Sequence, residues 1–370
     1  MKRAIILISP EYWGRNFVSK HHYAVYLSEK YEVFFIEPPS AWTWKALFLP
    51  KIRRTEINGH LHVISMPNIL PKLNYLPKWI QYLLFKIQAI RILNFLKIKQ
   101  PDIVWSFTPM IYWNLNIWGA KHKIYHTVDF HPAKFEEDTC KSADVVISVT
   151  DLISEPIKEF NPKLYKFGHG ADIRNFEKGD LTKVKLPGNQ STKVGYVGNF
   201  HRHIDYSLLE RLAKKYHQLD FIMVGPLGKS NLSHFNTIED NDLERLKKLP
   251  NVFFTDAIPS EQLMNYLLHF DINLVIFKDD KKIIHCNPHK MMGYFYAGGV
   301  TVSNFLDEYK DKRDLLLMAD HESEIEELFT YAVSHLEELN NDEHKTRRRA
   351  YAIKNSYANI IEKIEKLLVN

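Results

Sequence analysis

Short apolar runs alternate with helical patterns along the whole chain, and this alternation predicts its secondary structure. In the first half, apolar and β-branched runs predict a helix near 17–29 and strands at 3–9, 31–36, 61–65, 102–107, 123–128 and 144–149. The same order returns in the second half, with helices expected near 206–216, 240–249, 260–269 and 289–296 and strands at 193–197, 220–224, 251–255, 271–277 and 300–303. Strands that alternate with helices predict an α/β fold with parallel sheets.

A polar stretch, residues 175–191, separates the two halves and contains Gly179, Pro187 and Gly188, which predicts a linker. We therefore expect a Rossmann-like acceptor domain at 1–175, a Rossmann-like donor domain at 192–345, and a helix at 346–370 that packs back toward the first domain. Two doubly wound domains of this kind are expected to face each other across a cleft that holds the ligand.

The charge of the chain is distributed unevenly. Its 370 residues carry a net charge of +5, but residues 1–100 hold 15 Lys and Arg against 5 Asp and Glu, whereas the remainder is net acidic. This asymmetry predicts an anionic partner for the first half.

The two cysteines, Cys140 and Cys286, favour a reducing compartment and do not indicate a disulfide framework. No signal peptide opens the chain and no apolar run is long enough to span a bilayer, so we expect a cytoplasmic protein.

The strongest candidate chemistry lies between the strands expected at 271–277 and 300–303, in a segment that contains Asn287, Pro288, His289, Lys290, Met291 and Tyr294. Its loop is expected at the carboxyl end of a parallel sheet, where open α/β sheets bind ligands. The amide groups at the start of the next helix and the charge of Lys290 both favour an anion, which predicts a phosphate ester as ligand. The alternative is an ordinary helix start with a solvated Lys290.

Several stretches, taken in order, resemble a GT-B glycosyltransferase. Residues 287–298 resemble the N-P-x-K-x-x-E-Y-x-A-x-G segment of nucleotide-sugar transferases, and residues 195–199 and 221–226 resemble the first strands of their donor domain. Residues 127–129 and 169–176 resemble a strand end and the exit of their acceptor domain. The pattern is most similar to glycosyltransferase family 4 and to the xanthan glucuronosyltransferase, but the two glutamates usual in family 4 are replaced by His285 and Gly293.

The resemblance implies a hexosyl- or glucuronosyl-transferase that takes a UDP-sugar as donor and needs no cofactor and no metal. Cations and amide groups must then stabilise the leaving diphosphate. Lys290 is the first candidate for this role. The second is the loop with Gly198, Asn199 and Arg202, because Gly198 permits close approach of a ligand and Arg202 offers a bidentate contact. The alternative for this loop is a solvated connection.

An inverting transfer also needs a base for the acceptor hydroxyl. Asp129, at the end of the strand expected at 123–128, is the first candidate, and its alternative is a loop or cap aspartate. Lesser candidates on the acceptor side flank the first strand-to-helix loop: Glu11, Gly14 and His22. The sequence 240–242, Asp-Asn-Asp, is similar to a D-x-D metal motif, but we interpret it as the cap of the next helix.

Residues 77–98 predict an amphipathic helix, with Lys78, Lys86, Arg91 and Lys97 set against the apolar residues Trp79, Leu83, Leu84, Ile87, Ile90, Leu93 and Phe95. Aromatic and basic groups at 42–45 and 51–54 add to this composition. It predicts peripheral association with the anionic inner face of the cell membrane. The alternative is a core helix whose lysines face water.

These features together predict a metal-independent transferase. It would move a sugar, for example a uronic acid, to a lipid-linked or growing glycan in bacterial capsule, exopolysaccharide or O-antigen synthesis, and no nucleic-acid partner is expected. Two alternatives stay open. One is a nucleotide-sugar epimerase of the same fold, and the other is a non-catalytic partner subunit that binds a nucleotide sugar.

Overall fold

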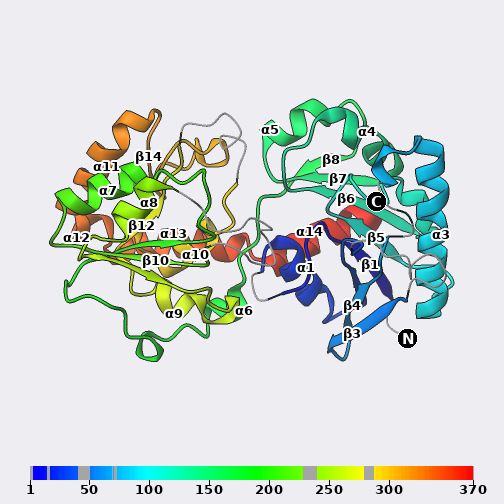
Figure 1. The fold of residues 1–370 in the computed structure, drawn as a ribbon, viewed down its shortest axis with the longest axis horizontal. Helices are drawn as coiled ribbons and strands as arrows, with labels where there is room; N and C mark the ends of the chain where they lie inside the picture. The colour runs from blue at the N-terminus through cyan, green and yellow to red at the C-terminus, as the bar shows by residue number, and fades with distance from the viewer. Residues whose placement is uncertain are drawn as a thin grey trace. The chain divides into compact units, whose positions relative to one another are not determined.

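The computed structural model describes residues 3–14, 17–40, 51–68, 70, 73–227, 240–278 and 287–369. The chain divides into two compact units. Unit 1 consists of residues 1–14, 18–168 and 360–370, and unit 2 of residues 15–17 and 169–359. Each unit is built on one sheet with helices beside it (Figure 1).

Unit 1 contains an eight-stranded sheet in the order β3-β4-β2-β1-β5-β6-β7-β8. All neighbouring strands are parallel except β3 and β4, which are antiparallel. The strands are β1 (Ala4–Ile8), β2 (Glu32–Ile36), β3 (Arg53–Asn58), β4 (Leu61–Ser65), β5 (Ile103–Ser106), β6 (His122–Thr127), β7 (Val145–Ser148) and β8 (Leu164–Lys166). The helices are α1 (Ser19–Leu27), α3 (Lys78–Leu96), α4 (Ala133–Ser142), α5 (Asp151–Ser154) and most of α14 (Tyr357–Val369).

Unit 2 contains a fully parallel six-stranded sheet in the order β11-β10-β9-β12-β13-β14. The strands are β9 (Lys193–Val197), β10 (Asp220–Val224), β11 (Val252–Thr255), β12 (Ile272–Val275), β13 (Val300–Ser303) and β14 (Leu317–Met318). The helices are α6 (Ile173–Phe176), α7 (Tyr206–Lys215), α8 (Asn241–Leu246), α9 (Leu263–Leu267), α10 (Met291–Ala297), α11 (Ile325–Ser334), α12 (Leu336–Leu339) and α13 (Asp342–Lys354).

The central strands of both sheets are buried on both faces, and for that reason they are formed by nearly continuous apolar runs. Residues 5–8 of β1 and 221–224 of β10 are almost completely shielded from water. Removing each such large apolar side chain from water contributes roughly 1.5–3 kcal/mol to folding. The two sheets therefore form two separate cores, as two Rossmann-like units require.

Each sheet has one place where the strand order reverses. In unit 1 the chain runs from β1 outward to β2 and later returns to β5 on the other side of β1, and in unit 2 the same happens at β9, β10 and β12. The loops that follow the strands on either side of such a switch point diverge, which leaves room for a ligand at the carboxyl edge of the sheet. The first places to search for a site are therefore the loops after β1 and β5 and those after β9 and β12.

The units divide at other positions than the sequence predicts. Residues 175–191 are not a linker, because residues 173–186 pack against the core of unit 2 and the Asp180 amide donates to Asn265 Oδ1 at 2.8 Å. The chain instead passes from unit 1 to unit 2 at residues 168–169. The helix expected at 346–370 is divided in two by a break after Lys354. From residue 360 onward the chain belongs to unit 1, the domain toward which this helix was expected to pack.

Strand β3 was not foreseen because all its residues are exposed, so it lacks an apolar face. It forms a hairpin with β4 across the two turn residues Gly59 and His60. A glycine between two short runs is a turn signal, and it could have pointed to this strand. Arg54 lies on β3 and forms an ion pair with Glu32 at 3.8 Å. Because its charge is paired, Arg54 does not contribute to the basic surface expected at 51–54.

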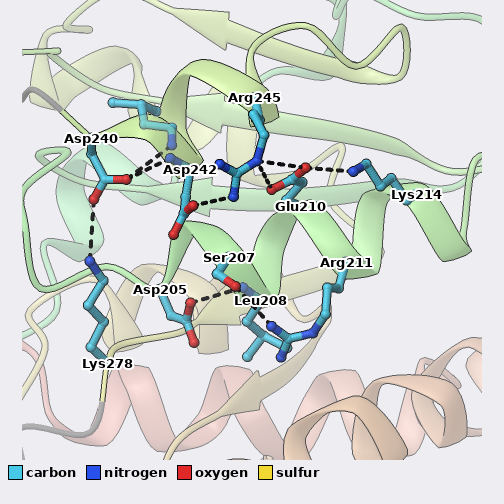
Figure 2. A network of polar contacts seen from close by, with 11 residues as sticks. Asp205, Ser207, Leu208, Glu210, Arg211, Lys214, Asp240, Asp242, Arg245 and Lys278 are labelled. Carbon is cyan, nitrogen blue, oxygen red and sulfur yellow. Dashed lines mark hydrogen bonds and ion pairs between the residues drawn. The ribbon is translucent and has the colours of Figure 1, made fainter.

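The Asp-Asn-Asp sequence at 240–242 caps a helix, as predicted (Figure 2). The Asp240 carboxylate accepts hydrogen bonds from the amides of Asp242 and Leu243, and it also pairs with Lys278 at 3.3 Å. Asp242 pairs with Arg245, whose guanidinium also reaches Glu210 of α7. These carboxylates are thus engaged in holding α7, α8 and the end of β12 together.

Candidate active site

Lys290 is the central feature of the candidate site in unit 2. Its Nζ atom is buried and has no hydrogen-bond partner among the described residues. The ammonium lies 3.6 Å from the ring centroid of Tyr196, at the end of β9, and 5.5 Å from that of Phe277, just beyond β12. Lys290 therefore lies at the switch point of the unit 2 sheet, on an aromatic floor formed by Tyr196 and Phe277, and its charge has no counter-ion among the described residues.

The surroundings of Lys290 shift its acidity. Burial lowers the pKa of its ammonium from 10.5 to about 7. Burial, with the nearby charge of Lys290 as the second cause, also lowers the pKa of His201 to about 4, so this imidazole is neutral at physiological pH. A buried cation without a partner is costly unless an anion completes the site. The geometry therefore favours the binding of an anion beside Lys290.

Gly198 lies beside the ammonium of Lys290, and Gly225 packs against the backbone of Gly198. Gly198 has φ +143°, and a Cβ at this residue would lie 3.4 Å from Lys290 Nζ. Gly225, with φ +145°, lies so close that a Cβ there would be 2.0 Å from the Gly198 carbonyl oxygen. The Gly198 amide donates to Val224 at 2.9 Å, which fixes this crossing of the loops after β9 and β10. Both glycines have positive φ, and a side chain at Gly225 would collide with the Gly198 backbone at this crossing. The close approach of a ligand to Gly198 stays a prediction.

The segment before α10 is held by its own hydrogen bonds. Asn287 is buried, and its Oδ1 accepts a hydrogen bond from the Tyr309 hydroxyl at 3.2 Å. The Met291 amide donates to Pro288 O at 3.0 Å, so the helix begins at Met291 and Lys290 occupies the N-cap position. The expected helix start near 289 is therefore two residues too early. With only seven residues, α10 also gives little macrodipole, and the side chain of Lys290 is the main attraction for an anion.

Met291 and Tyr294 have packing roles in this segment, and they do not present polar groups to a ligand. Both side chains are fully buried. The Tyr294 hydroxyl accepts from the Val197 amide at 2.9 Å and lies 3.3 Å from Leu274 O, so it fastens the ends of β9 and β12 around α10. The sequence prediction that Tyr294 contacts a donor ligand is corrected accordingly: its hydroxyl is taken by main-chain groups.

Other predicted donor-side residues differ in exposure. Arg202 is exposed and lies 3.4 Å from His203, and Asn199 is half-buried in the loop after β9. His289 lies 2.5 Å from the Tyr357 hydroxyl and packs edge-on against His169. It therefore connects the candidate loop to the two chain segments at the border of unit 2.

The aromatic floor and His201 were missed by the sequence reasoning. Tyr196 and Phe277 lie at strand ends, and an aromatic residue at such a position was the available signal. Residues 279–286, including Lys281, Lys282 and Cys286, lie outside the described residues. The same holds for residues 41–50, which include Trp42 and Trp44.

The candidate site in unit 1 lies at the carboxyl edge of its sheet. After β1, Glu11 forms an ion pair with the buried Lys20 of α1, with Oε2 and Nζ 2.7 Å apart. Burial raises the pKa of Glu11, Lys20 lowers it, and Asp129 raises it further. Burial lowers the pKa of His131, while Asp129 opposes this shift. The structure thus brings together Glu11 and Asp129, both predicted, with Lys20 and His131, which were not.

Asp129 is the exposed acid of this group and lies two residues after the end of β6. Glu11 is less available, because its carboxylate is engaged by Lys20. Gly14 is half-buried at the end of the described part of the loop after β1, and His22 is buried within α1. Among these four predicted residues, Asp129 is therefore the one whose carboxylate is open to a ligand.

Two general properties of the described residues bear on function. None of the helices described here combines the length and the apolar character that crossing a membrane requires. In the same parts of the chain, no three His, Cys, Asp or Glu side chains come together as a possible metal site.

Comparison with solved structures identifies proteins of similar fold, whereas comparison by sequence finds no match. No protein-family model matches the chain, and no curated protein sequence matches it. Its structure is similar to glycosyltransferases of the GT-B fold. At the identities found, below 15%, this similarity establishes the architecture alone.

Three solved structures illustrate the similarity. Trehalose-6-phosphate synthase from Escherichia coli, bound with UDP-2-fluoroglucose, has a TM-score of 0.70 at 11% identity over 99% of each chain. Sucrose-phosphate synthase from Thermosynechococcus elongatus has a TM-score of 0.72 at 13% identity over 100% of this chain and 99% of that one. A glycosyltransferase from Rickettsia africae has a TM-score of 0.67 at 14% identity over 99% and 98%. None of these is described as a family 4 or xanthan-type enzyme, so that finer resemblance stays a prediction.

Proposed function

We propose that this protein is a glycosyltransferase that takes its sugar from a nucleoside diphosphate sugar, with UDP-sugars as the first donors to test. The observation that carries the proposal is the unpaired, buried ammonium of Lys290 at the switch point of unit 2, in a chain with the GT-B fold. In such a transfer negative charge grows on the leaving diphosphate. A preorganised cation in a water-poor site stabilises that charge more strongly than it stabilises the neutral sugar ring.

The donor assignment follows from the geometry around Lys290. Gly198 leaves the space beside the ammonium free of a side chain, and the flat ring of Tyr196 closes the space below it. A diphosphate is the anion that we place there, with the amides near Gly198 as further donors. Arg202 and Asn199 are assigned to more peripheral contacts, because Arg202 is exposed and Asn199 is half-buried.

Calorimetry with UDP and a panel of UDP-sugars tests the donor site. Loss of a charged contact to phosphate costs roughly 1.5–3 kcal/mol, so Lys290→Ala should weaken binding by about one to two orders of magnitude. The matched control is Lys215→Ala, an exposed lysine on α7 of the same unit, which should bind like the native protein. Equal affinities in all three proteins, or no binding of any nucleotide by the native chain, would refute the donor assignment.

We assign the acceptor to unit 1 and the base to Asp129. An exposed carboxylate at the carboxyl edge of the sheet, beside the Glu11–Lys20 pair, is suited to accept the proton of an acceptor hydroxyl. The proposed acceptor is a lipid-linked glycan of a bacterial surface polysaccharide. The support for this acceptor is the strong excess of basic residues in the first 100 positions.

Turnover with Asp129→Asn tests the base. General base catalysis contributes typically a factor of about 10² to 10⁴, so kcat should fall by that factor while UDP-sugar affinity is unchanged. Asp151→Asn, an exposed aspartate at the start of α5 after the next strand, is the matched control. Conversion of a UDP-sugar in the absence of any acceptor would instead indicate an epimerase.

A further inference from the structure

Helix α3 of unit 1 has two apolar faces, where the sequence pattern predicts one. Its inner face, with Phe85, Ala89, Ile92 and Leu93, packs against the core of unit 1. Its outer face carries four large side chains that remain in water: Trp79 is 70% exposed, Leu83 50%, Ile87 41% and Ile90 45%. Spacings of four, four and three residues place these four side chains along one side of the helix.

This outer face is a long apolar strip. A helix of 19 residues is about 28 Å long. The outer side of a helix that covers a sheet is normally polar, because only one stripe has to be buried. Here the four apolar residues follow one another along three helical turns, and the exposed ring of Tyr75 precedes them. Contiguous apolar surface of this kind marks an interaction site.

The charge around the outer face specifies the partner. Between Glu56 and Asp102 the sequence contains six Lys and Arg and no acidic residue. Lys86 lies three residues after Leu83 and four before Ile90, so it borders the strip, and Lys97 ends it. Both lysines are exposed, and neither forms an ion pair with any other described residue. Lys78, in contrast, is paired with Asp138.

We propose that the outer face of α3 docks onto an anionic lipid surface, with the helix axis parallel to the membrane plane. Trp79 and the aliphatic residues would enter the interfacial region, and Lys86 and Lys97 would contact lipid phosphates. A second copy of the chain is disfavoured as the occupant, because two such faces would bring like charges together. The proposal does not depend on nucleotide binding, but it would hold unit 1 where a lipid-linked acceptor is found.

Sedimentation of the full chain with lipid vesicles tests the apolar part of this surface. The native protein should bind vesicles that contain phosphatidylglycerol much more tightly than vesicles of phosphatidylcholine alone. The double variant Leu83→Gln, Ile87→Gln should bind at least about tenfold more weakly, because two apolar side chains can no longer leave water. The control is Ile353→Gln on α13 of unit 2, where the isoleucine is 45% exposed and binding should not change.

The basic part is tested by Lys86→Gln and Lys97→Gly. Lys97 has φ +57° at the end of α3, a conformation that glycine adopts without strain, so this variant removes a charge without endangering the helix end. Each variant should weaken binding about fivefold at moderate salt, since a lysine near an anionic surface contributes about 1 kcal/mol. High salt should reduce these differences.

Three results would overturn the proposal. They are equal binding to both kinds of vesicle, unchanged binding of the Leu83→Gln, Ile87→Gln variant, and self-association of the native chain that this variant abolishes. UDP affinity, measured on the same preparations, should be the same in all four variants. Failure of membrane docking would therefore be distinguishable from failure of the donor site.

Discussion

Two buried cations lie at opposite ends of helix α10, and they differ in whether the protein supplies hydrogen-bond acceptors for them. Arg348, only 2% exposed, donates to Gly298 O at 2.7 Å, to Leu315 O at 3.1 Å and to Asn340 Oδ1 at 3.3 Å. Lys290, at the other end, has no such partner for its Nζ within the described chain. The charge of Arg348 is thus satisfied by the protein itself, whereas that of Lys290 is satisfied only if something else binds.

This difference in hydrogen bonding shows how a structural cation can be distinguished from a functional one. Burial lowers the pKa of both groups, that of Arg348 to about 10 and that of Lys290 to about 7. For Arg348 the carbonyl groups offset the loss of water, and the residue joins the end of α10 to the segments before β14 and α13. For Lys290 no group in the described parts of the chain does so, and the residue reduces stability in the absence of ligand.

Of the variants that test this comparison, Arg348→Met is expected to have the largest effect on the free energy of unfolding. Removing the guanidinium leaves buried carbonyl groups without a donor, which should lower the free energy of unfolding by about 3 kcal/mol or more. Chemical denaturation measures this loss. Arg347→Met and Arg349→Met change exposed neighbours on the same helix, and each should stay within about 0.5 kcal/mol of the native protein. A loss of the same size in these neighbours would remove the special role of Arg348.

For Lys290→Met the opposite sign is expected. An apolar side chain of similar length takes the place of a buried, unpaired charge, so the nucleotide-free variant should be about 1–3 kcal/mol more stable than the native protein at neutral pH. The same denaturation experiment measures this gain. A clear loss of stability would show that Lys290 contributes to the fold in the way Arg348 does.

This gain should depend on pH in a defined window. The pKa of Lys290 is depressed in the folded state, so the cost of its charge is fully present below about pH 7 and fades as pH rises toward the unfolded value of 10.5. The stability difference between Lys290→Met and the native protein should therefore shrink by at most about 1.4 kcal/mol per pH unit between pH 7 and 10. A difference that is constant over this range would contradict the assignment of the shift to Lys290.

A smaller, related effect is expected in ligand binding. A bound diphosphate raises the pKa of Lys290, so UDP binding at pH 8 should take up part of a proton and should weaken as pH rises further. Calorimetry in two buffers of different ionisation enthalpy measures this uptake. Lys290→Met should show none, and an equal uptake in the variant would place the titrating group elsewhere.

The comparison also separates what the sequence could reveal from what it could not. Apolar and β-branched runs at 193–197, 220–224 and 300–303 predicted three strands with their observed bounds, because strands buried on both faces are rich in such residues. Lys290 was predicted because it stands at an expected helix start, in the connection between two such strands. Arg348 could not be recognised, since it is the middle member of the run Arg347-Arg348-Arg349 and only packing decides which of them points inward.

The pairing of Lys20 with Glu11 was invisible for a similar reason. The two residues belong to a loop and to the helix after it, and no spacing rule connects them. Exposed elements such as β3 were missed because hydrophobic periodicity appears only in elements that bury one face, and β3 buries none of its residues. The chemistry of a site is therefore easier to predict from sequence when its residue lies in the connection between two apolar strands.

Thermal unfolding of the native protein and of Lys290→Met, each with and without UDP, tests the central claim most directly. Without nucleotide the variant should unfold at the higher temperature. With UDP in excess this difference should shrink by roughly 1.5–3 kcal/mol, because the native protein binds UDP about one to two orders of magnitude more tightly and therefore gains more stability from it. Stabilisation of both proteins by UDP to the same extent, or of neither, would contradict the claim that Lys290 is kept unpaired for a diphosphate.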